Sequence, residues 1–200
     1  MHVKRVAARC FYQLRQLWSI CPVLSADNTR MLVHALIASR VDYCNSILCH
    51  VADVHLHPFQ LVLDAAARLV VKKWKYNSIT STHHDDLHWL LVPERINYKI
   101  CLFIFKCLHQ LAPPYLSSMI VPLLAASTRR HLRSAGQGDL LVPRTRTASF
   151  GPRGFPVAGP SSWNNLPSAM KTPSLSVMQF YNRLKTELYI RSCYASVQLS

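Results

Sequence analysis

Acidic residues are scarce in this sequence. Nine Asp and Glu stand against 23 Lys and Arg among 200 residues, which gives a formal net charge of +14. The shortage is sharpest in residues 101–200, where 11 bases face two acids and the net charge is +9. A surface with this surplus repels itself unless something anionic neutralises it. The composition therefore favours nucleic acid or an acidic membrane face as the partner, and charge alone does not choose between the two.

Long hydrophobic runs and paired cysteines are also missing. The longest apolar run is six residues, ICLFIF at 100–105, whereas a membrane-spanning helix needs about 20. The seven cysteines include no C-x-x-C pair of the kind that zinc ribbons and redox sites use. Bases spread through the first 18 residues do not resemble a signal peptide. We therefore expect no membrane partner, no cofactor and a reducing, intracellular compartment.

Glycine and proline are rare before position 113. All five glycines lie between 136 and 159, and only three of the 12 prolines precede 113. With 50% hydrophobic residues the chain is able to bury a core. The sequence predicts a mainly α fold: a helical, thumb-like bundle over 1–121, an irregular Arg-rich, Pro/Gly-rich segment over 122–173 with one short β-hairpin, and a C-terminal helix and tail over 174–200.

Apolar residues recur at helical spacing in four stretches of the first region. The predicted helices cover 3–18, 25–38, about 58–73 and 93–111, and the last is apolar nearly all round, as expected of a central core helix. Their apolar stripes are Val3, Val6, Cys10, Leu14, Leu17 and Trp18; Met31, Ala35 and Ala38; Phe59, Val62, Leu63, Ala66 and Val70; and Ile96, Ile100, Phe103, Cys107 and Leu111.

Local signals also mark the start of the last helix and the hairpin. Ser176 and Gln179 match a capping box, and Leu175 and Phe180 occupy the positions of a hydrophobic staple. The helix that follows is predicted to bury Val177, Phe180, Tyr181, Leu184 and Leu188. Short strands are predicted at DLLVPRT (139–145) and TASF (147–150), where β-branched and apolar residues flank turns.

An arginine cluster carries the strongest functional signal. Asp139 is the only acid between Glu94 and Glu187. Guanidinium groups pair with phosphate oxygens and stack on bases, so Arg-rich, Phe-containing loops suit a nucleic-acid backbone. A solvated basic loop is the alternative, with the interleaved Phe150, Phe155 and Trp163 serving as anchors to the helices. The candidate binding residues are Arg129, Arg130, Arg133, Arg144, Arg146 and Arg153.

Two acidic or imidazole patterns suggest metal chemistry only weakly. His84 and His88 are four residues apart, as in H-E-x-x-H zinc helices, but the sequence places no third ligand. Asp85 and Asp86 resemble the paired aspartates of two-metal polymerase sites, which require a hairpin between hydrophobic strands. A capped turn ahead of a helix explains these residues equally well, so we expect no metal site.

Cys44, Cys49 and His50 form the pattern closest to a nucleophile with a base. A nucleophilic cysteine requires a positioned base and a group that stabilises the developing charge. The sequence identifies neither, so we expect buried or bystander thiols and no catalytic residue.

Several stretches together resemble the C-terminal region of reverse transcriptases from LINE-type, non-LTR retrotransposons of the jockey-like kind. The matching stretches are collinear and span nearly the whole chain. They are SRVDYCNSIL (39–48), LDAAARLV (63–70), DLHWLLVPERINYKI (86–100), LHQLAPPYLSSMI (108–120), LLVPRTRTASFGPRGF (140–155), WNNLPSAM (163–170) and SVMQFYNRLKTELY (176–189).

The resemblance implies a thumb-like helical segment and a C-terminal extension that follow a catalytic palm. It also implies that the polymerase aspartates lie upstream, so that this chain performs no nucleotidyl transfer. Gly151, Arg153 and Phe155 keep the family's G-x-R-x-F spacing, whereas Pro152 stands where an acid is usual and Gly154 is atypical. No C-terminal zinc knuckle is present.

The sequence therefore predicts a non-catalytic fragment of an RNA-directed DNA polymerase that binds an RNA or DNA backbone without sequence preference. The missing palm is its second expected partner, and the nucleus its location if it acts with the parent enzyme. The alternatives are a structural helical segment that packs on the palm or on another protein, and a decayed element copy without function.

Overall fold

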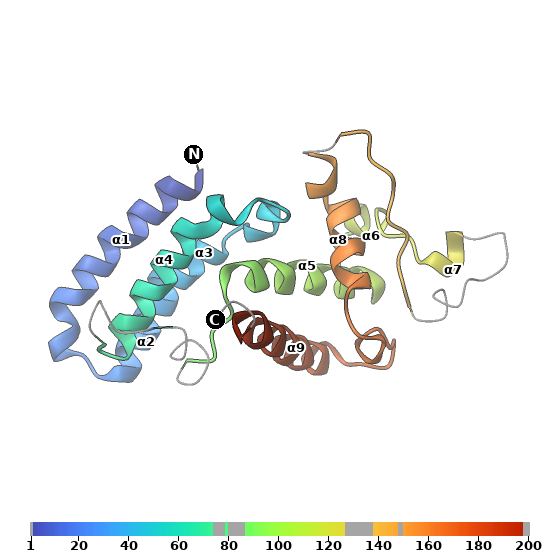
Figure 1. Ribbon diagram of the computed structural model, residues 1–200. Coiled ribbons are helices and arrows are strands. Elements are labelled where there is room, and N and C mark those ends of the chain that lie inside the picture. Colours follow the sequence, from blue (N-terminus) through green and yellow to red (C-terminus); the bar gives the residue numbers. More distant parts are fainter. Residues whose placement is uncertain (1, 74–78, 80–86, 127–137, 148–149, 198–200) are drawn as a thin grey trace. The chain divides into compact units, whose positions relative to one another are not determined.

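The computed structural model of the chain describes residues 2–73, 79, 87–126, 138–147 and 150–197 (Figure 1). These residues are mainly helical, which confirms the predicted fold class. The α-helices are α1 (His2–Ile20), α2 (Ala26–Val33), α3 (Ser39–Asp42), α4 (Asp53–Val70), α5 (Val92–Leu108), α6 (Pro114–Ser117), α7 (Leu123–Ala126), α8 (Phe155–Asn164) and α9 (Val177–Val197). Shorter helical segments are η1 (Cys21–Val23), η2 (His34–Ala38), η3 (Asn45–Leu48), η6 (Gly151–Arg153) and η7 (Ser168–Met170).

The chain divides into two compact units, each built from separate stretches of sequence. Unit 1 comprises Met1–Asn45, Val51–Arg95 and Tyr189–Ser200, and unit 2 comprises Ser46–His50 and Ile96–Leu188. These units do not correspond to the three regions predicted from composition, because each unit combines residues from more than one region. The three-region division therefore stays a prediction.

In unit 1, α1 packs along α4 (Figure 1). The predicted first helix is confirmed, and it ends at Ile20, ahead of Pro22. Trp18, expected on the buried stripe, is exposed, so that assignment is wrong. A helix turns about 100° per residue, and the stripe is centred far enough from Trp18 to leave the indole at its edge. The residues that α1 buries are Ala7, Cys10, Leu14 and Leu17.

The second predicted helix forms as α2, a π-helical turn at η2, and α3. Ser25 caps it as expected, because its side chain accepts a hydrogen bond of 3.2 Å from the Asn28 backbone N–H. Met31 and Ala35 are exposed, so their place on the predicted stripe is wrong. The i, i+4 series offset by two residues from Met31 and Ala35 is the one that packs inward, and it consists of Thr29, Val33, Ile37 and Val41, joined by Ala38.

Helix α4 buries every residue of its predicted stripe, Phe59, Val62, Leu63, Ala66 and Val70. It begins at Asp53, earlier than predicted, so that Pro58 lies inside the helix rather than in its first turn. The helix ends where Lys72 adopts a positive φ of 53° and the Lys73 N–H donates to the Arg68 carbonyl at 3.0 Å. This is a Schellman-type ending built without glycine.

The core of unit 2 is aromatic. Phe105 of α5 stacks on Phe180 of α9 with ring centroids 4.2 Å apart, and Trp163 of α8 lies 5.7 Å from Phe180. Helix α8 approaches α5 closely because Gly159 has no side chain: a Cβ there would lie 2.6 Å from Ile104 Cδ1. The buried side chains of α5 in this unit are Ile96, Ile100, Cys101, Ile104, Phe105 and Cys107.

The central position predicted for α5 agrees with this burial, but two members of its stripe do not. Phe103 is only half-buried, and Leu111 is exposed beyond the helix end at Leu108. The helix stops early because Gln110 adopts a positive φ and the Leu111 N–H bonds back to the Lys106 carbonyl at 2.8 Å.

The capping box of α9 is confirmed by both of its hydrogen bonds. The Gln179 side chain accepts from the Ser176 N–H at 3.0 Å, and the Ser176 side chain accepts from the Gln179 N–H at 3.2 Å. Of the residues expected to be buried by this helix, Phe180, Leu184 and Leu188 are buried, and Val177 and Tyr181 are half-buried.

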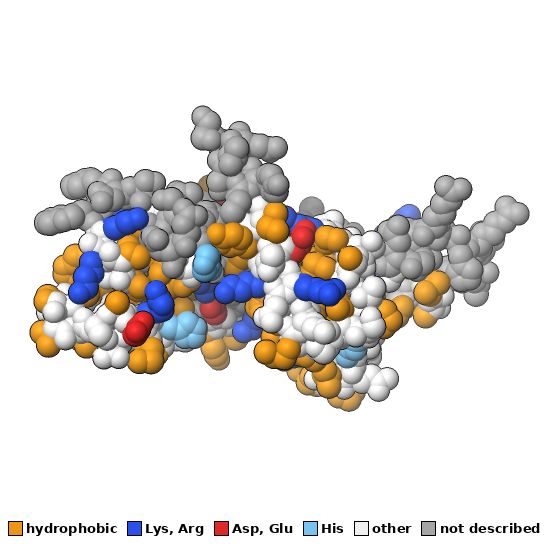
Figure 2. Space-filling view, turned by 90° about the horizontal axis from the view of Figure 1, so that it is seen from below, with side chains coloured by type: hydrophobic (Ala, Val, Ile, Leu, Met, Phe, Trp, Pro, Cys, Tyr) orange, Lys and Arg blue, Asp and Glu red, His pale blue; other side chains and the backbone are white. Residues whose placement is uncertain are grey.

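The predicted hairpin is unconfirmed. Residues 148–149 lie outside the described residues, and within 138–147 the structure shows only an isolated antiparallel bridge between Pro122 and Leu140. No helix among the described residues is long and apolar enough to cross a membrane. On the face shown in Figure 2, Lys and Arg side chains are more frequent than Asp and Glu side chains.

Candidate nucleic-acid interface

Residues 138–147 and 150–154, which we call the arginine segment, are clamped at their start by the end of α8. The Asn164 side chain accepts from the Leu140 N–H at 2.9 Å and donates to the Leu140 carbonyl at 2.9 Å. The buried Trp163 indole donates to the Gly138 carbonyl at 3.0 Å. These bonds hold the beginning of the segment to the core of unit 2, as the anchoring role of Trp163 predicts.

The one acid of the arginine segment is occupied. Lys171 Nζ pairs with Asp139 Oδ1 at 2.7 Å and also donates to the Asn164 carbonyl at 2.8 Å. The Lys171 side chain is only 4% exposed and that of Asp139 17%. Since this carboxylate already has its cation, it is not available to neutralise the neighbouring arginines.

The structure describes three of the six candidate arginines. Arg144 and Arg146 are exposed, and Arg153 is half-buried. None of the three forms an ion pair with a carboxylate of the described residues. The other three candidates, Arg129, Arg130 and Arg133, lie outside the described residues.

The arginine segment doubles back on itself. The Gly151 N–H donates to Thr147 Oγ1 at 2.9 Å, and a Cβ on Gly151 would lie 2.5 Å from that of Thr145. This close approach requires glycine at 151. It brings Arg144 and Arg146, which flank Thr145, beside the turn that carries Arg153.

His50 fixes the turn from outside the segment. Its Nδ1 lies 2.9 Å from the Pro152 carbonyl oxygen, which only accepts hydrogen bonds, so Nδ1 carries the proton and donates it. The turn is therefore held both by Thr147 and by a side chain far away in sequence. These two bonds hold the backbone directly after Phe150, the aromatic residue of the arginine segment.

Phe150 departs from the anchoring role considered for the three aromatic residues. Its side chain is 77% exposed, whereas Trp163 is buried and Phe155 half-buried. The Arg153 guanidinium carbon lies 5.8 Å from the centre of the Phe150 ring, within cation–π range. Phe150 is thus an exposed ring paired with a cation.

His50 Nδ1 is not available as a base for Cys49. Although His50 Nδ1 lies 3.7 Å from Cys49 Sγ, that nitrogen already carries the proton that it donates to Pro152, so it does not accept the thiol proton. Burial raises the pKa of the Cys49 thiol, which disfavours the nucleophilic thiolate. Cys44 is exposed.

The two metal hypotheses fall largely outside the described residues, which include neither His84 nor Asp85 nor Asp86. His88 is described: it is exposed, and its ring meets Tyr189 edge-on at 6.0 Å. No group of three potential metal ligands occurs in the described part of the chain.

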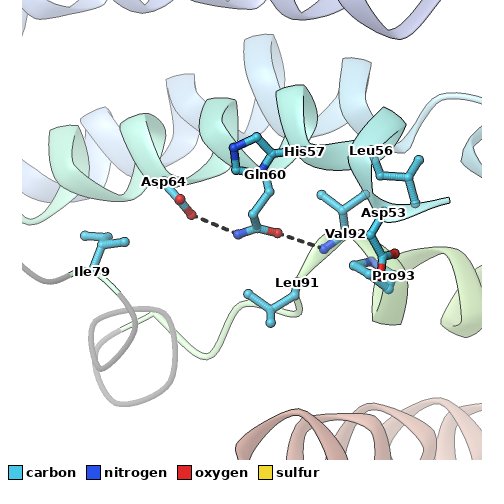
Figure 3. A pocket seen from close by; sticks show the side chains of 9 residues that line it. All are labelled: Asp53, Leu56, His57, Gln60, Asp64, Ile79, Leu91, Val92 and Pro93. Atoms are coloured by element: carbon cyan, nitrogen blue, oxygen red, sulfur yellow. Dashed lines mark hydrogen bonds between the residues drawn. The ribbon is translucent and has the colours of Figure 1, made fainter. Parts of the chain in front are cut away.

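Unit 1 contains a pocket that, unlike the arginine segment, is lined by carboxylates and apolar side chains (Figure 3). Its volume is about 330 Å³, and Gln60 joins its walls by donating to Asp64 Oδ1 at 2.8 Å and accepting from the Val92 N–H at 3.1 Å. The Val92 bond satisfies a free donor at the start of α5. With two carboxylates and no Lys or Arg, the pocket does not suit a polyanion. Its lining residues are Asp53, Leu56, His57, Gln60, Asp64, Ile79, Leu91, Val92 and Pro93.

Glu94 lies in the first turn of α5 and follows Pro93, a lining residue of this pocket, in the sequence. Its Oε2 is buried and has no hydrogen-bond partner among the described residues. Burial raises the pKa of Glu94, and the negative charge of Asp53 raises it further. Ionised Glu94 therefore opposes folding at neutral pH.

We expect Glu94→Gln to raise the free energy of unfolding at pH 7 by on the order of 1 kcal/mol, because it removes a partly buried charge while keeping the shape. A raised folded-state pKa means that the native protein holds the proton more tightly than the unfolded chain. The Glu94 contribution is therefore most favourable below its unfolded pKa and declines as the pH rises through the folded pKa. Urea unfolding from pH 4 to pH 8 measures this, and an advantage of the variant that does not grow with pH contradicts it.

The described residues thus place Arg144, Arg146, Arg153 and Phe150 on one clamped segment, with Arg153 beside the Phe150 ring. Sequence reasoning found these arginines but missed Lys171, Asn164 and His50, which position them. The chain matches no protein-family model, no curated protein and no solved structure with which it was compared.

Proposed function

We propose that the chain is a non-catalytic nucleic-acid-binding protein that holds a sugar-phosphate backbone through the arginine segment, without sequence preference. The observation that carries the proposal is that Arg144, Arg146 and Arg153 lack a carboxylate partner among the described residues, although an acid stands in the same segment. Pairing of Asp139 with Lys171 leaves the positive charge of these arginines for an external anion.

The chemistry of the group favours phosphate as that anion. Guanidinium presents a planar fork of donors that matches two phosphate oxygens, and it is weakly hydrated compared with an ammonium group. Several such groups on one backbone-fixed segment match the repeated charges of a nucleic-acid strand. The net charge of +14 adds long-range attraction to the same ligand.

We further propose that the chain is a C-terminal, post-palm segment of a LINE-type reverse transcriptase, with the palm as its second partner. The collinear motifs, among them residues 140–155 and 163–170, support this proposal. Those two motifs supply the arginine segment and the Trp163–Asn164 clamp that holds it.

The test is the salt dependence of affinity for a 20-base-pair DNA and for a 15-nucleotide RNA. Replacing Arg144, Arg146 and Arg153 by alanine removes three phosphate contacts. We expect the slope of log affinity against log salt to become shallower by about 2.7 for the DNA duplex and about 2.1 for the RNA strand, and affinity near 0.15 M salt to fall roughly 100-fold. Fluorescence anisotropy from 50 to 300 mM salt measures both quantities.

A matched control removes the same charge from unit 1. Lys4, Arg5 and Arg9 are exposed on α1, and their triple alanine variant has the same net charge as the arginine-segment variant. We expect the control to keep most of the wild-type slope. Equal slopes in the two variants, or a wild-type protein whose binding does not depend on salt, would overturn the assignment of the site.

Exposed apolar side chains favour a second candidate, a structural segment that packs against another protein. Val23 and Val54 of unit 1 are 90% and 81% exposed, and Trp18 and Met31 are also exposed. Surfaces of this kind associate when their partner is missing. Gel filtration separates the candidates: a nucleic-acid-binding protein shifts on adding oligonucleotide, whereas a structural segment self-associates and ignores it.

A further inference from the structure

We infer that the ligand of the arginine segment is a single strand, one base of which stacks on the ring of Phe150 while phosphates pair with the neighbouring arginines. This inference rests on the proposed function and narrows its ligand from any nucleic acid to unpaired strands. Bases in a duplex are already stacked on their neighbours, whereas those of a single strand are free to stack on a protein ring.

The exposure of Phe150 is the first observation behind the inference. A phenylalanine that is 77% exposed gains almost nothing from folding, whereas Phe155 and Trp163, which follow the turn in α8, are half-buried and buried. A single exposed aromatic residue is common on protein surfaces and needs no explanation alone. Here the ring belongs to a turn whose backbone is held by bonds from Thr147 and His50.

The held backbone is the second observation. The Arg153 N–H donates to the Phe150 carbonyl at 3.2 Å, and the Gly154 N–H to the Gly151 carbonyl at 3.1 Å, so Phe150 directly precedes a closed helical turn. Because the backbone is already ordered, binding has to restrict only the two side-chain torsions of the ring. Stacking a base on a ring that a preorganised turn already holds therefore loses little conformational entropy.

Arg153 is the third observation. Its guanidinium carbon lies 5.8 Å from the Phe150 ring centre, so the cation already contacts the platform. Proteins that bind single strands combine aromatic rings for the bases with a positively charged path for the backbone. Arg144 and Arg146 flank Thr145, whose side chain lies against Gly151, and we infer that they supply that path. A single strand uses both an aromatic ring for a base and cations for its phosphates, whereas a duplex backbone uses only the cations. The arginine segment offers both.

The experiment compares three ligands with equal numbers of phosphates: a thymidine 15-mer, an abasic 15-mer and a duplex of the same phosphate count. The proteins are wild type, Phe150→Ala and Phe150→Trp. We expect wild type to bind the thymidine strand roughly tenfold more tightly than the abasic strand, which lies within the range of effects for one stacked base. Phe150→Ala loses this preference, and Phe150→Trp keeps it.

The salt slope distinguishes failure of the inference from failure of the proposed function. Phe150→Ala removes no charge, so its slope on the abasic strand should equal that of wild type. If wild type binds all three ligands equally with a steep slope, stacking is wrong and backbone binding stands. If no ligand binds with a salt-dependent affinity, the proposed function itself is wrong. Because the comparison of thymidine and abasic strands also uses wild-type protein, the inference is tested even if a variant misfolds.

Discussion

Replacing Lys171 by methionine lowers the free energy of unfolding by about 3 kcal/mol at neutral pH, the low end of the range for breaking a buried ion pair from one side. The Lys171 side chain is 4% exposed and makes both the 2.7 Å pair with Asp139 and the 2.8 Å bond to the Asn164 carbonyl. Methionine fills similar space but leaves the partly buried Asp139 carboxylate without its cation. Urea unfolding followed by circular dichroism measures the loss.

Two further variants isolate the cause of that loss. Asp139→Asn combined with Lys171→Met removes both charges, so we expect most of the lost stability to return. Lys185→Met removes an exposed lysine of α9 in the same unit, and its effect should stay within about 0.5 kcal/mol. A double variant no more stable than Lys171→Met alone would contradict an electrostatic cause.

The same ion pair connects stability with the proposed site. Asp139 is the carboxylate nearest in sequence to Arg144 and Arg146. Without its pairing to Lys171, this carboxylate would be free to compete with phosphate for these arginines. Lys171 removes that competition and at the same time ties the start of the arginine segment to Asn164. We therefore expect Lys171→Met to weaken nucleic-acid binding as well as folding, whereas substitution of the arginines weakens binding alone.

Predictions from sequence succeeded where the signal is local. The capping box of Ser176 and Gln179 spans one turn, and both of its hydrogen bonds form. The stripe of α4 from Phe59 to Val70 repeats long enough to define a single buried face. In such cases the residues that determine the structure are the same residues in which the signal is read.

Predictions failed where two series of apolar residues compete for the buried face. In the second helix Met31 and Ala35 compete with Val33 and Ile37, and packing against the other helices of unit 1 selects the latter pair. Apolar spacing defines candidate faces but not which of them meets a neighbouring helix. The same limit explains the exposure of Trp18, which lies at the edge of an otherwise correct stripe.

The candidate site was predictable in residue type but not in construction. Arginine, phenylalanine and glycine within a proline-rich stretch indicated phosphate binding and a shaped loop. The side chains that shape it come from elsewhere: Asn164 lies 24 residues from Leu140, Lys171 lies 32 from Asp139, and His50 lies 102 from Pro152. Pairings of this length carry no periodicity, so a single sequence does not reveal them.

Replacing Phe180 by alanine lowers the free energy of unfolding by about 3–5 kcal/mol and leaves unit 2 without the centre of its core. Phe180 is fully buried, stacks on Phe105 at 4.2 Å and lies 5.7 Å from Trp163, so one truncation leaves a cavity that borders α5, α8 and α9 at once. Met178→Ala on the same helix is the matched control, because Met178 is 66% exposed and its loss should change stability by less than about 0.5 kcal/mol. Since Trp163 and its neighbour Asn164 hold the arginine segment, salt-dependent nucleic-acid binding should weaken together with folding in Phe180→Ala and stay intact in Met178→Ala. Full binding by a destabilised Phe180→Ala protein would show that the arginine segment acts without its clamp.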